Sequence, residues 1–162
     1  MKLKSLTPLL FLIAAGCASS HAAIQSASSS AATILSPYNT QIEIGDNKLN
    51  VQIVSSAADM QQGLSGRTNM PANDGMLFDF GAAANSAGAF WMKDMNFNLD
   101  FIWIKNHQVV GVTYDAPAPI GNWKLEIENL PLYYPPSPID EVIEVNAGWA
   151  KENNIRVGDA VK

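Results

Sequence analysis

The chain of 162 residues has a single cysteine, Cys17, and two histidines, His21 and His107. One cysteine excludes an internal disulfide, so a folded domain must be held together by core packing. The chain has few residues from which a serine–histidine–aspartate or cysteine–histidine catalytic centre could be built, because His107 is the one histidine after residue 22 and no cysteine follows Cys17. Phosphate-loop and dinucleotide-binding fingerprints are absent as well.

Basic side chains are few and do not cluster. The formal net charge is -5, and it becomes -7 if residues 1–22 are removed, because Lys2 and Lys4 leave with that segment and no acid does. A chain this acidic is unsuited to nucleic acid. It would also hold to an anionic membrane only through a covalent anchor. We therefore expect a monomer with no nucleic-acid partner and with at most a lipid anchor at a membrane.

Long apolar runs are missing too. The run Leu6–Gly16 is shorter than the ~20 residues of a membrane-spanning helix, and with two lysines before it the run is typical of a signal peptide. Residues 1–22 are therefore predicted to be a leader and the protein to be exported. Residues 14–17 resemble a bacterial lipobox, in which Cys17 is acylated. Cleavage after Ala22 is the alternative, and it would release a soluble periplasmic protein.

Residues 18–37 are rich in serine and alanine and have no clear periodicity, which predicts a flexible tether. About 20 flexible residues span on the order of 25 Å. The remainder, residues 40–162, has the length of one ordinary domain.

That remainder carries the alternating pattern of short strands. Phe101–Ile104 is apolar on both faces, which predicts a central strand covered on both sides. The prediction is a mainly β (α+β) domain, a sandwich or a partly closed barrel with two short helices. Strands are expected at 41–44, 49–54, 76–80, 89–92, 99–104, 109–114, 141–145, near Leu125 and at the end of 156–161, and helices at 56–64 and 148–153.

Five segments, GLSGR, GMLFDF, FWMKDMNFNLDFIWI, VIEVNAGWA and VGDAV, resemble in order and spacing the bacterial and archaeal family called domain of unknown function 192 (DUF192). The resemblance runs from about Leu49 to Val161. It implies a compact, jelly-roll-like β domain and brings no established reaction, ligand or cofactor, so no cofactor is expected. Asp94, Met95 and Asn98 stand where the family usually has Asn, Thr and Pro.

The resemblance also singles out a set of polar positions. They are Arg67, Lys93, Asp100, Glu144, Gly148 and Asp159, with Asp94 as a variant. Asp100 and Glu144 adjoin strong strand-formers, where an inward carboxylate needs a partner. Ion pairs with Arg67 or Lys93 would lock the structure, whereas a polar cleft would let either cation receive an anionic group. The acids lack the spacing of a calcium loop, and no metal is expected.

The aromatic residues divide into two groups. Trp91 and Trp103 alternate with apolar strand residues and are expected in the core. Trp123, Tyr133 and Tyr134 lie in the proline-rich segment 116–138. The favoured interpretation is that this segment packs onto the domain; the alternative is that exposed rings contact a sugar or another protein.

Two functions follow from these residues. The favoured one is a non-catalytic cell-envelope module that binds a small anionic or polysaccharide ligand or an envelope protein. The alternative is a hydrolase that uses Asp100 and Glu144 as a carboxylate pair, and the separation of the two groups in space decides it.

Cys17→Ala tests the anchor. Metabolic labelling with a fatty acid in a bacterial host, followed by intact-mass measurement, should show an acylated protein that loses its label in the variant. An unlabelled wild-type chain that begins near Ala23 would contradict the anchor and indicate a diffusing periplasmic protein.

Overall fold

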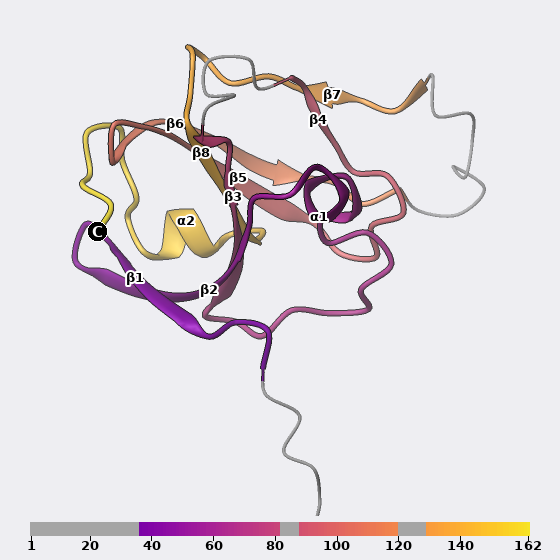
Figure 1. Ribbon diagram of the computed structural model, residues 1–162, viewed down its shortest axis with the longest axis horizontal. Helices are drawn as coiled ribbons and strands as arrows, with labels where there is room; N and C mark the ends of the chain where they lie inside the picture. The colour runs from indigo at the N-terminus through magenta and orange to yellow at the C-terminus, as the bar shows by residue number, and fades with distance from the viewer. Residues whose placement is uncertain (1–35, 82–87, 120–128) are drawn as a thin grey trace, which may run out of the picture. The chain divides into compact units, whose positions relative to one another are not determined.

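Eight strands and two short helices make up the part of the chain that the computed structural model describes, residues 36–81, 88–119 and 129–162 (Figure 1). The elements are, in order, β1 (Thr40–Ile44), β2 (Asn47–Val54), α1 (Ala57–Gln62), β3 (Asp74–Asp79), β4 (Phe90–Trp91), β5 (Leu99–Lys105), β6 (Gln108–Ala116), β7 (Leu132–Tyr133), β8 (Glu141–Asn146) and α2 (Trp149–Glu152). No helix among these residues is long and apolar enough to span a membrane.

Six of the strands form one mixed sheet in the order β1-β2-β3-β8-β5-β6, and β4 pairs with β7 as a separate ribbon. The pair β2–β3 is parallel and the other pairs are antiparallel. The sheet is not closed into a barrel, although single bridges from Val161 to Ile44 and from Ala160 to Gln108 link its two edge strands to the C-terminal residues. The mainly β, sandwich-like α+β fold with two short helices is thus confirmed.

Turn chemistry fixes the two hairpins. Gly45 has φ +58° between β1 and β2, where a side chain would be strained. Asn106 and His107 have φ +49° and +58° between β5 and β6. Two successive positive φ angles are typical of the type I′ turn, whose twist matches that of the strands it joins.

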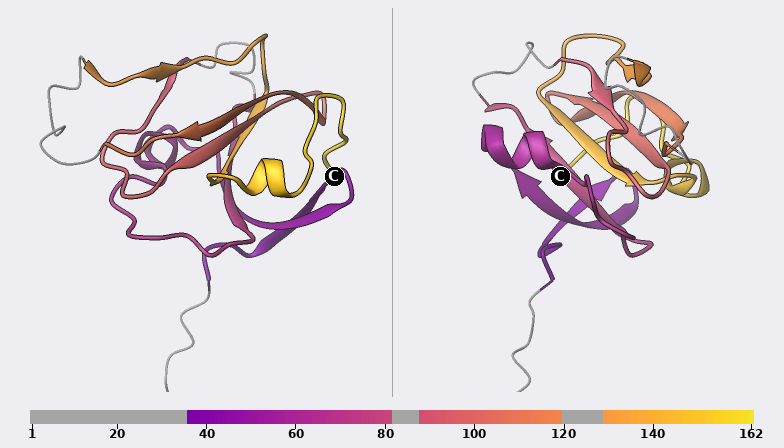
Figure 2. Two further views of the ribbon diagram at one scale, coloured as in Figure 1. Left: turned by 180° about the vertical axis from the view of Figure 1, so that it is seen from behind. Right: turned by 90° about the vertical axis from the view of Figure 1, so that its right-hand side faces the viewer.

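The central strands β3, β8 and β5 are buried on both faces, whereas β1, β2 and β6 also carry exposed residues. One face carries Ile102 and Ile143 and packs against α2. The other carries Phe101 and Val142 and packs against the β4–β7 ribbon, which runs along the top of both views in Figure 2, on the far side from β1. β5 lies between β8 and β6 and is buried from Leu99 to Ile104, which confirms the expected central strand.

Asp100 ties β5 to its surroundings. Its side chain is fully buried and accepts hydrogen bonds from the backbone N–H groups of Asp115 (2.8 Å), Gly148 (3.0 Å) and Ala150 (3.1 Å). Gly148 is the N-terminal cap of α2 and has φ +91°. The carboxylate therefore holds β6 and the start of α2 in place.

Some predicted bounds were wrong. α1 begins after its cap Ser56, as expected, but ends at Gly63, whose φ of +50° terminates it. The C-terminal residues form a turn and two single bridges in place of a full strand. Leu125 lies outside the described residues, and a strand of the proline-rich segment is β7, at Leu132–Tyr133.

Asp100→Asn tests the role of this carboxylate. The amide keeps the shape but places an N–H₂ group against backbone donors, so we expect the free energy of unfolding to fall by roughly 2–4 kcal/mol, measured by urea denaturation. The exposed Asp46→Asn is the control and should stay within about 0.5 kcal/mol of wild type. An equally small effect of Asp100→Asn would contradict the structural role.

Candidate functional site

Glu144 lies near the middle of the sheet. In β8 it pairs with Met76 of β3 on one side and with Phe101 of β5 on the other, and directly paired residues point to the same face. The residue is only 5% exposed. Its carboxyl group is therefore set among the apolar side chains of the face that carries Phe101.

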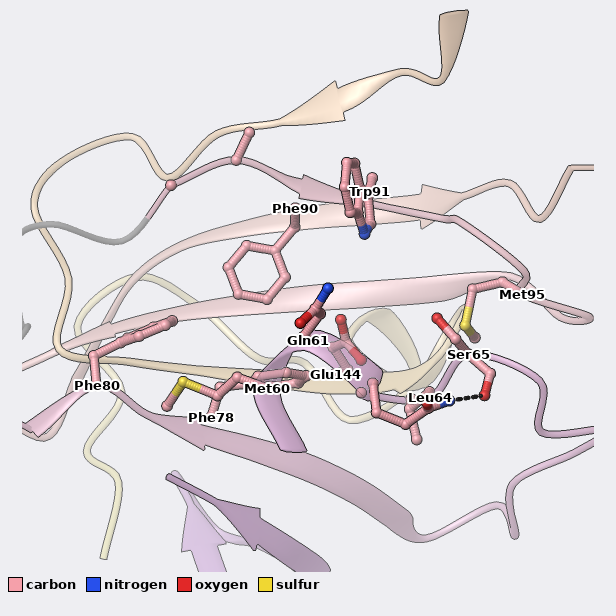
Figure 3. Close-up of a pocket in the computed structure, with 14 residues that line it drawn as sticks. Met60, Gln61, Leu64, Ser65, Phe78, Phe80, Phe90, Trp91, Met95 and Glu144 are labelled. Carbon is pink, nitrogen blue, oxygen red and sulfur yellow. Dashed lines mark hydrogen bonds between the residues drawn. The ribbon is translucent and has the colours of Figure 1, made fainter. Parts of the chain in front are cut away.

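A pocket of about 240 Å³ opens over this position. Figure 3 shows the Glu144 side chain amid it, with Phe90 and Trp91 on one side and Leu64, Ser65 and Met95 on others. The lining comes from α1 and the loop after it, from β3, from β4 and its approach, from Met95 and from β8. These residues are Met60, Gln61, Gln62, Gly63, Leu64, Ser65, Phe78, Phe80, Gly88, Ala89, Phe90, Trp91, Met95 and Glu144.

No hydrogen bond or salt bridge joins the Glu144 carboxyl group to the described residues. Its oxygens are not among the fully buried polar atoms without a partner, unlike Asp140 Oδ1, so they face the open pocket. Burial in apolar surroundings raises its pKa from the ordinary value of 4.5 to about 8, and the positive charge of Arg67 lowers it only in part. At neutral pH the group is therefore mostly protonated. A buried acid without a partner is unusual in a folded protein, and this makes Glu144 the prime candidate for a binding residue.

Arg67 is held away from Glu144. Its guanidinium donates hydrogen bonds to the Tyr38 hydroxyl and to Gln52 Oε1, both at 2.6 Å, and lies 5.4 Å from the centre of the Tyr38 ring. Gln52 pairs with Met76, which in turn pairs with Glu144. The guanidinium is thus held by Gln52, whose strand β2 is separated from β8 by β3.

Ion pairing within the predicted polar set is accordingly not found. A salt bridge in the described part of the chain joins Lys105 to Asp140 at 3.6 Å instead. Asp100 and Glu144 are buried, as the sequence predicted, but the ion pairs that were one of the two expected arrangements are not formed in the described part of the chain. Backbone amides satisfy Asp100.

Asp100 and Glu144 also face opposite ways. Asp100 pairs with Val145, one position along from the Phe101 and Glu144 pair, and successive side chains of a strand point to opposite faces of the sheet. Asp100 points toward α2 and Glu144 into the pocket. The two carboxyl groups do not converge on one cleft, so the geometry does not fit a hydrolase built on this pair.

Lys93 and Asp94 support the pocket through their backbones. The Ser65 hydroxyl donates to the Lys93 carbonyl and the Gly66 N–H to the Asp94 carbonyl, both at 2.8 Å. Asp94 has φ +55°, a conformation that asparagine and aspartate tolerate. These bonds join the GLSGR loop to the link between β4 and β5.

Asp159 belongs to another part of the fold. Its Oδ2 accepts a hydrogen bond from the Arg156 N–H at 2.8 Å and so closes the turn before the C-terminal bridges. Neither residue lines the pocket.

The aromatic expectations were partly wrong. Trp103 is in the core and donates to the Thr113 hydroxyl at 3.0 Å, but Trp91 is 43% exposed at the pocket. Tyr133 turns inward, with its ring centre 5.3 Å from that of Phe101, whereas Tyr134 is exposed. Trp123 lies outside the described residues.

Sequence reasoning missed the apolar lining of the site. Phe90 packs its ring against Phe78, Phe101 and Trp103 at centre distances of 5.4 to 5.7 Å, and it roofs the pocket beside Glu144 (Figure 3). The signal was the run FWM in the middle motif, which was assigned to packing alone. No group of three or more metal-ligating side chains occurs in the described ranges.

Fold and pocket together define a small mixed-sheet domain with one unpartnered acid in an apolar pocket. The chain belongs to the DUF192 family, whose model carries the description "Uncharacterized ACR" and matches residues 40–162. This confirms the resemblance of the five segments. No curated protein matches the chain.

Two solved structures share the fold. One is a protein of unknown function from Novosphingobium aromaticivorans, with 20% identity and a TM-score of 0.65 over 76% of this chain and 84% of that one. The other is a putative transcription regulator from Sinorhizobium meliloti, with 23% identity and a TM-score of 0.61 over 75% of this chain and 91% of that one. At these identities the likeness concerns the fold alone.

The pKa of Glu144 predicts an unusual dependence of stability on pH. Because the folded state keeps its proton up to about pH 8 while the unfolded chain loses it near its ordinary pKa of 4.5, the wild type should lose stability as pH rises between these values. Relative to that of Glu144→Gln, the free energy of unfolding of the wild type should fall by about 1.4 kcal/mol per pH unit.

Urea denaturation from pH 5 to 8 measures this difference, with the exposed Glu43→Gln as a control that should run parallel to wild type. A difference in the free energy of unfolding between wild type and Glu144→Gln that stays constant over this range would show that Glu144 is ionised throughout.

Proposed function

We propose that this domain is a non-catalytic binding module that takes a small, largely apolar molecule into the pocket over Glu144. The observation that carries the proposal is a carboxyl group, 5% exposed and without a hydrogen-bond partner among the described residues, in a pocket walled by apolar side chains. Burial removes much of the hydration of this group, so a ligand that forms a hydrogen bond with it in the pocket gains free energy.

The size of the pocket limits the ligand. A volume of about 240 Å³ is below the range of ~300–1,000 Å³ that is usual for drug-sized ligands. It exceeds the ~150 Å³ of an apolar cavity that accepts benzene. The ligand therefore has the size of a substituted single ring or a short branched chain.

A binding role suits the chemistry better than catalysis. Glu144 is the one titratable residue among the described residues that line the pocket, so no second acid or base stands beside it there. The Ser65 hydroxyl, which also lines the pocket, donates its hydrogen to the Lys93 carbonyl. Hydrolysis by a carboxylate pair would require two such groups on opposite sides of one bond.

The pocket does not suit all the ligand classes anticipated from the sequence equally well. An anionic molecule would meet an acid and no lining cation, since Arg67 is engaged by Tyr38 and Gln52. A polysaccharide or protein partner would have to use exposed side chains outside the pocket, such as Leu132 and Tyr134. The pocket therefore supports a small ligand most directly.

We place this module in the cell envelope. The support is the leader pattern of residues 1–22, the lipobox-like residues 14–17 with Cys17, and the serine-rich segment that follows. A lipid on Cys17 would keep the domain near a membrane, where apolar molecules accumulate.

Gln61→Trp tests the pocket. Gln61 is an exposed residue of α1 that lines it, so an indole there should block entry with little effect on folding. In a fragment screen by protein NMR, small aromatic probes should shift the signals of Phe90, Met95 and Glu144 in wild type and lose at least about tenfold in affinity in the variant, a change of about 1.4 kcal/mol.

Gln108→Trp is the matched control, because Gln108 is equally exposed but does not line the pocket. It should bind the probes as wild type does. Probes that shift no pocket signal in wild type, or that bind Gln61→Trp unchanged, would overturn the proposed function.

A further inference from the structure

Among the described residues that line the pocket, only Glu144 can carry a full charge, and that charge is negative. Resting on the proposed function, we infer that its ligand is a small organic cation, an amine with an aromatic or branched apolar body, whose ammonium group pairs with the Glu144 carboxylate. Charge, lining and position each support this class.

Charge comes first. Glu144 is the one residue of the described lining that can carry a full charge, and no lysine, arginine or histidine accompanies it there. Buried charges in proteins are normally paired. Glu144 is mostly protonated in the free protein, and an ammonium ligand brings the counter-ion that would stabilise its ionised form.

The nearest cation cannot take that place without breaking other contacts. Arg67 acts on Glu144 as a distant positive charge, but its guanidinium is committed to the Tyr38 hydroxyl and to Gln52. An internal ion pair would have to compete with both of these bonds.

Aromatic rings supply the rest of the lining. Phe78, Phe80, Phe90 and Trp91 all border the pocket, and ring faces attract cations as well as apolar groups. Trp91 is 43% exposed, and it lies with Phe90 on one side of the pocket (Figure 3). The pocket therefore combines an apolar seat for the body of the ligand with an acid for its head.

Binding of this kind is linked to a proton. The groups that face Glu144 from β3, β5, α1 and β4 are Met76, Phe101, Gln61 and Phe90, and none of them titrates. Arg67 is the charged group that acts on it. Since the free carboxyl group is mostly protonated below about pH 8, an ammonium ligand must displace that proton on binding. Nearly one proton is then released for each ligand well below this pH, and fewer as the pH approaches it.

Three probes of similar shape separate the possibilities: benzylamine, benzyl alcohol and benzoate. Affinities are measured by calorimetry on the folded full-length protein at pH 6, 7 and 8, where an alkylammonium group stays charged. Benzylamine should bind up to about tenfold tighter per pH unit as Glu144 becomes ionised, and it should release a proton in buffers of different ionisation enthalpy.

At pH 8 benzylamine should bind at least about tenfold tighter than benzyl alcohol, and benzoate should bind weakest. Glu144→Gln keeps the shape of the pocket, and in that variant benzylamine and benzyl alcohol should bind equally, with no dependence on pH. Benzyl alcohol binding to wild type as well as benzylamine does would overturn the cation and leave the proposed function standing. Failure of all three probes to bind would overturn both.

Discussion

The register between β5 and β8 is the constraint on which the rest of this structure depends. It pairs Phe101 with Glu144 and Asp100 with Val145, and so sends two acidic side chains to opposite faces of one central sheet. On one face Asp100 finds three backbone N–H groups and anchors the start of α2. On the other, Glu144 finds apolar side chains and a pocket. A shift of β8 by one residue would turn Glu144 to the other face of the sheet, the face that Asp100 occupies.

The contrast between these acids separates architecture from function. Asp100 is a buried charge whose hydrogen-bonding capacity is met by the fold, and such a group stabilises a particular arrangement of strands and helix. Glu144 is buried to a similar degree but has no such partner, and burial raises its pKa to about 8. The fold accepts a local cost there, which is common where a protein binds something.

Much of the fold could be predicted from the sequence because it depends on local sequence patterns. Alternation predicted the hairpin β1–β2, the apolar run Phe101–Ile104 predicted the central strand, and the segments GLSGR and FWMKDMNFNLDFIWI pointed to the DUF192 family that the chain belongs to. The partners of the acids were not readable, because they depend on strand order and register. Arg67 follows α1 in sequence, yet its position is set by Gln52 and Tyr38, contacts that span 15 and 29 residues.

The most direct test of the account is the titration of the Glu144 carboxyl carbon by NMR in the ligand-free protein, with Glu144→Gln to assign the signal. The account predicts a pKa near 8, as burial in the pocket requires. A midpoint close to the ordinary value of 4.5 would mean that the carboxyl group is solvated or paired within the fold. The central claim, an unpartnered acid held for a ligand, would then be wrong.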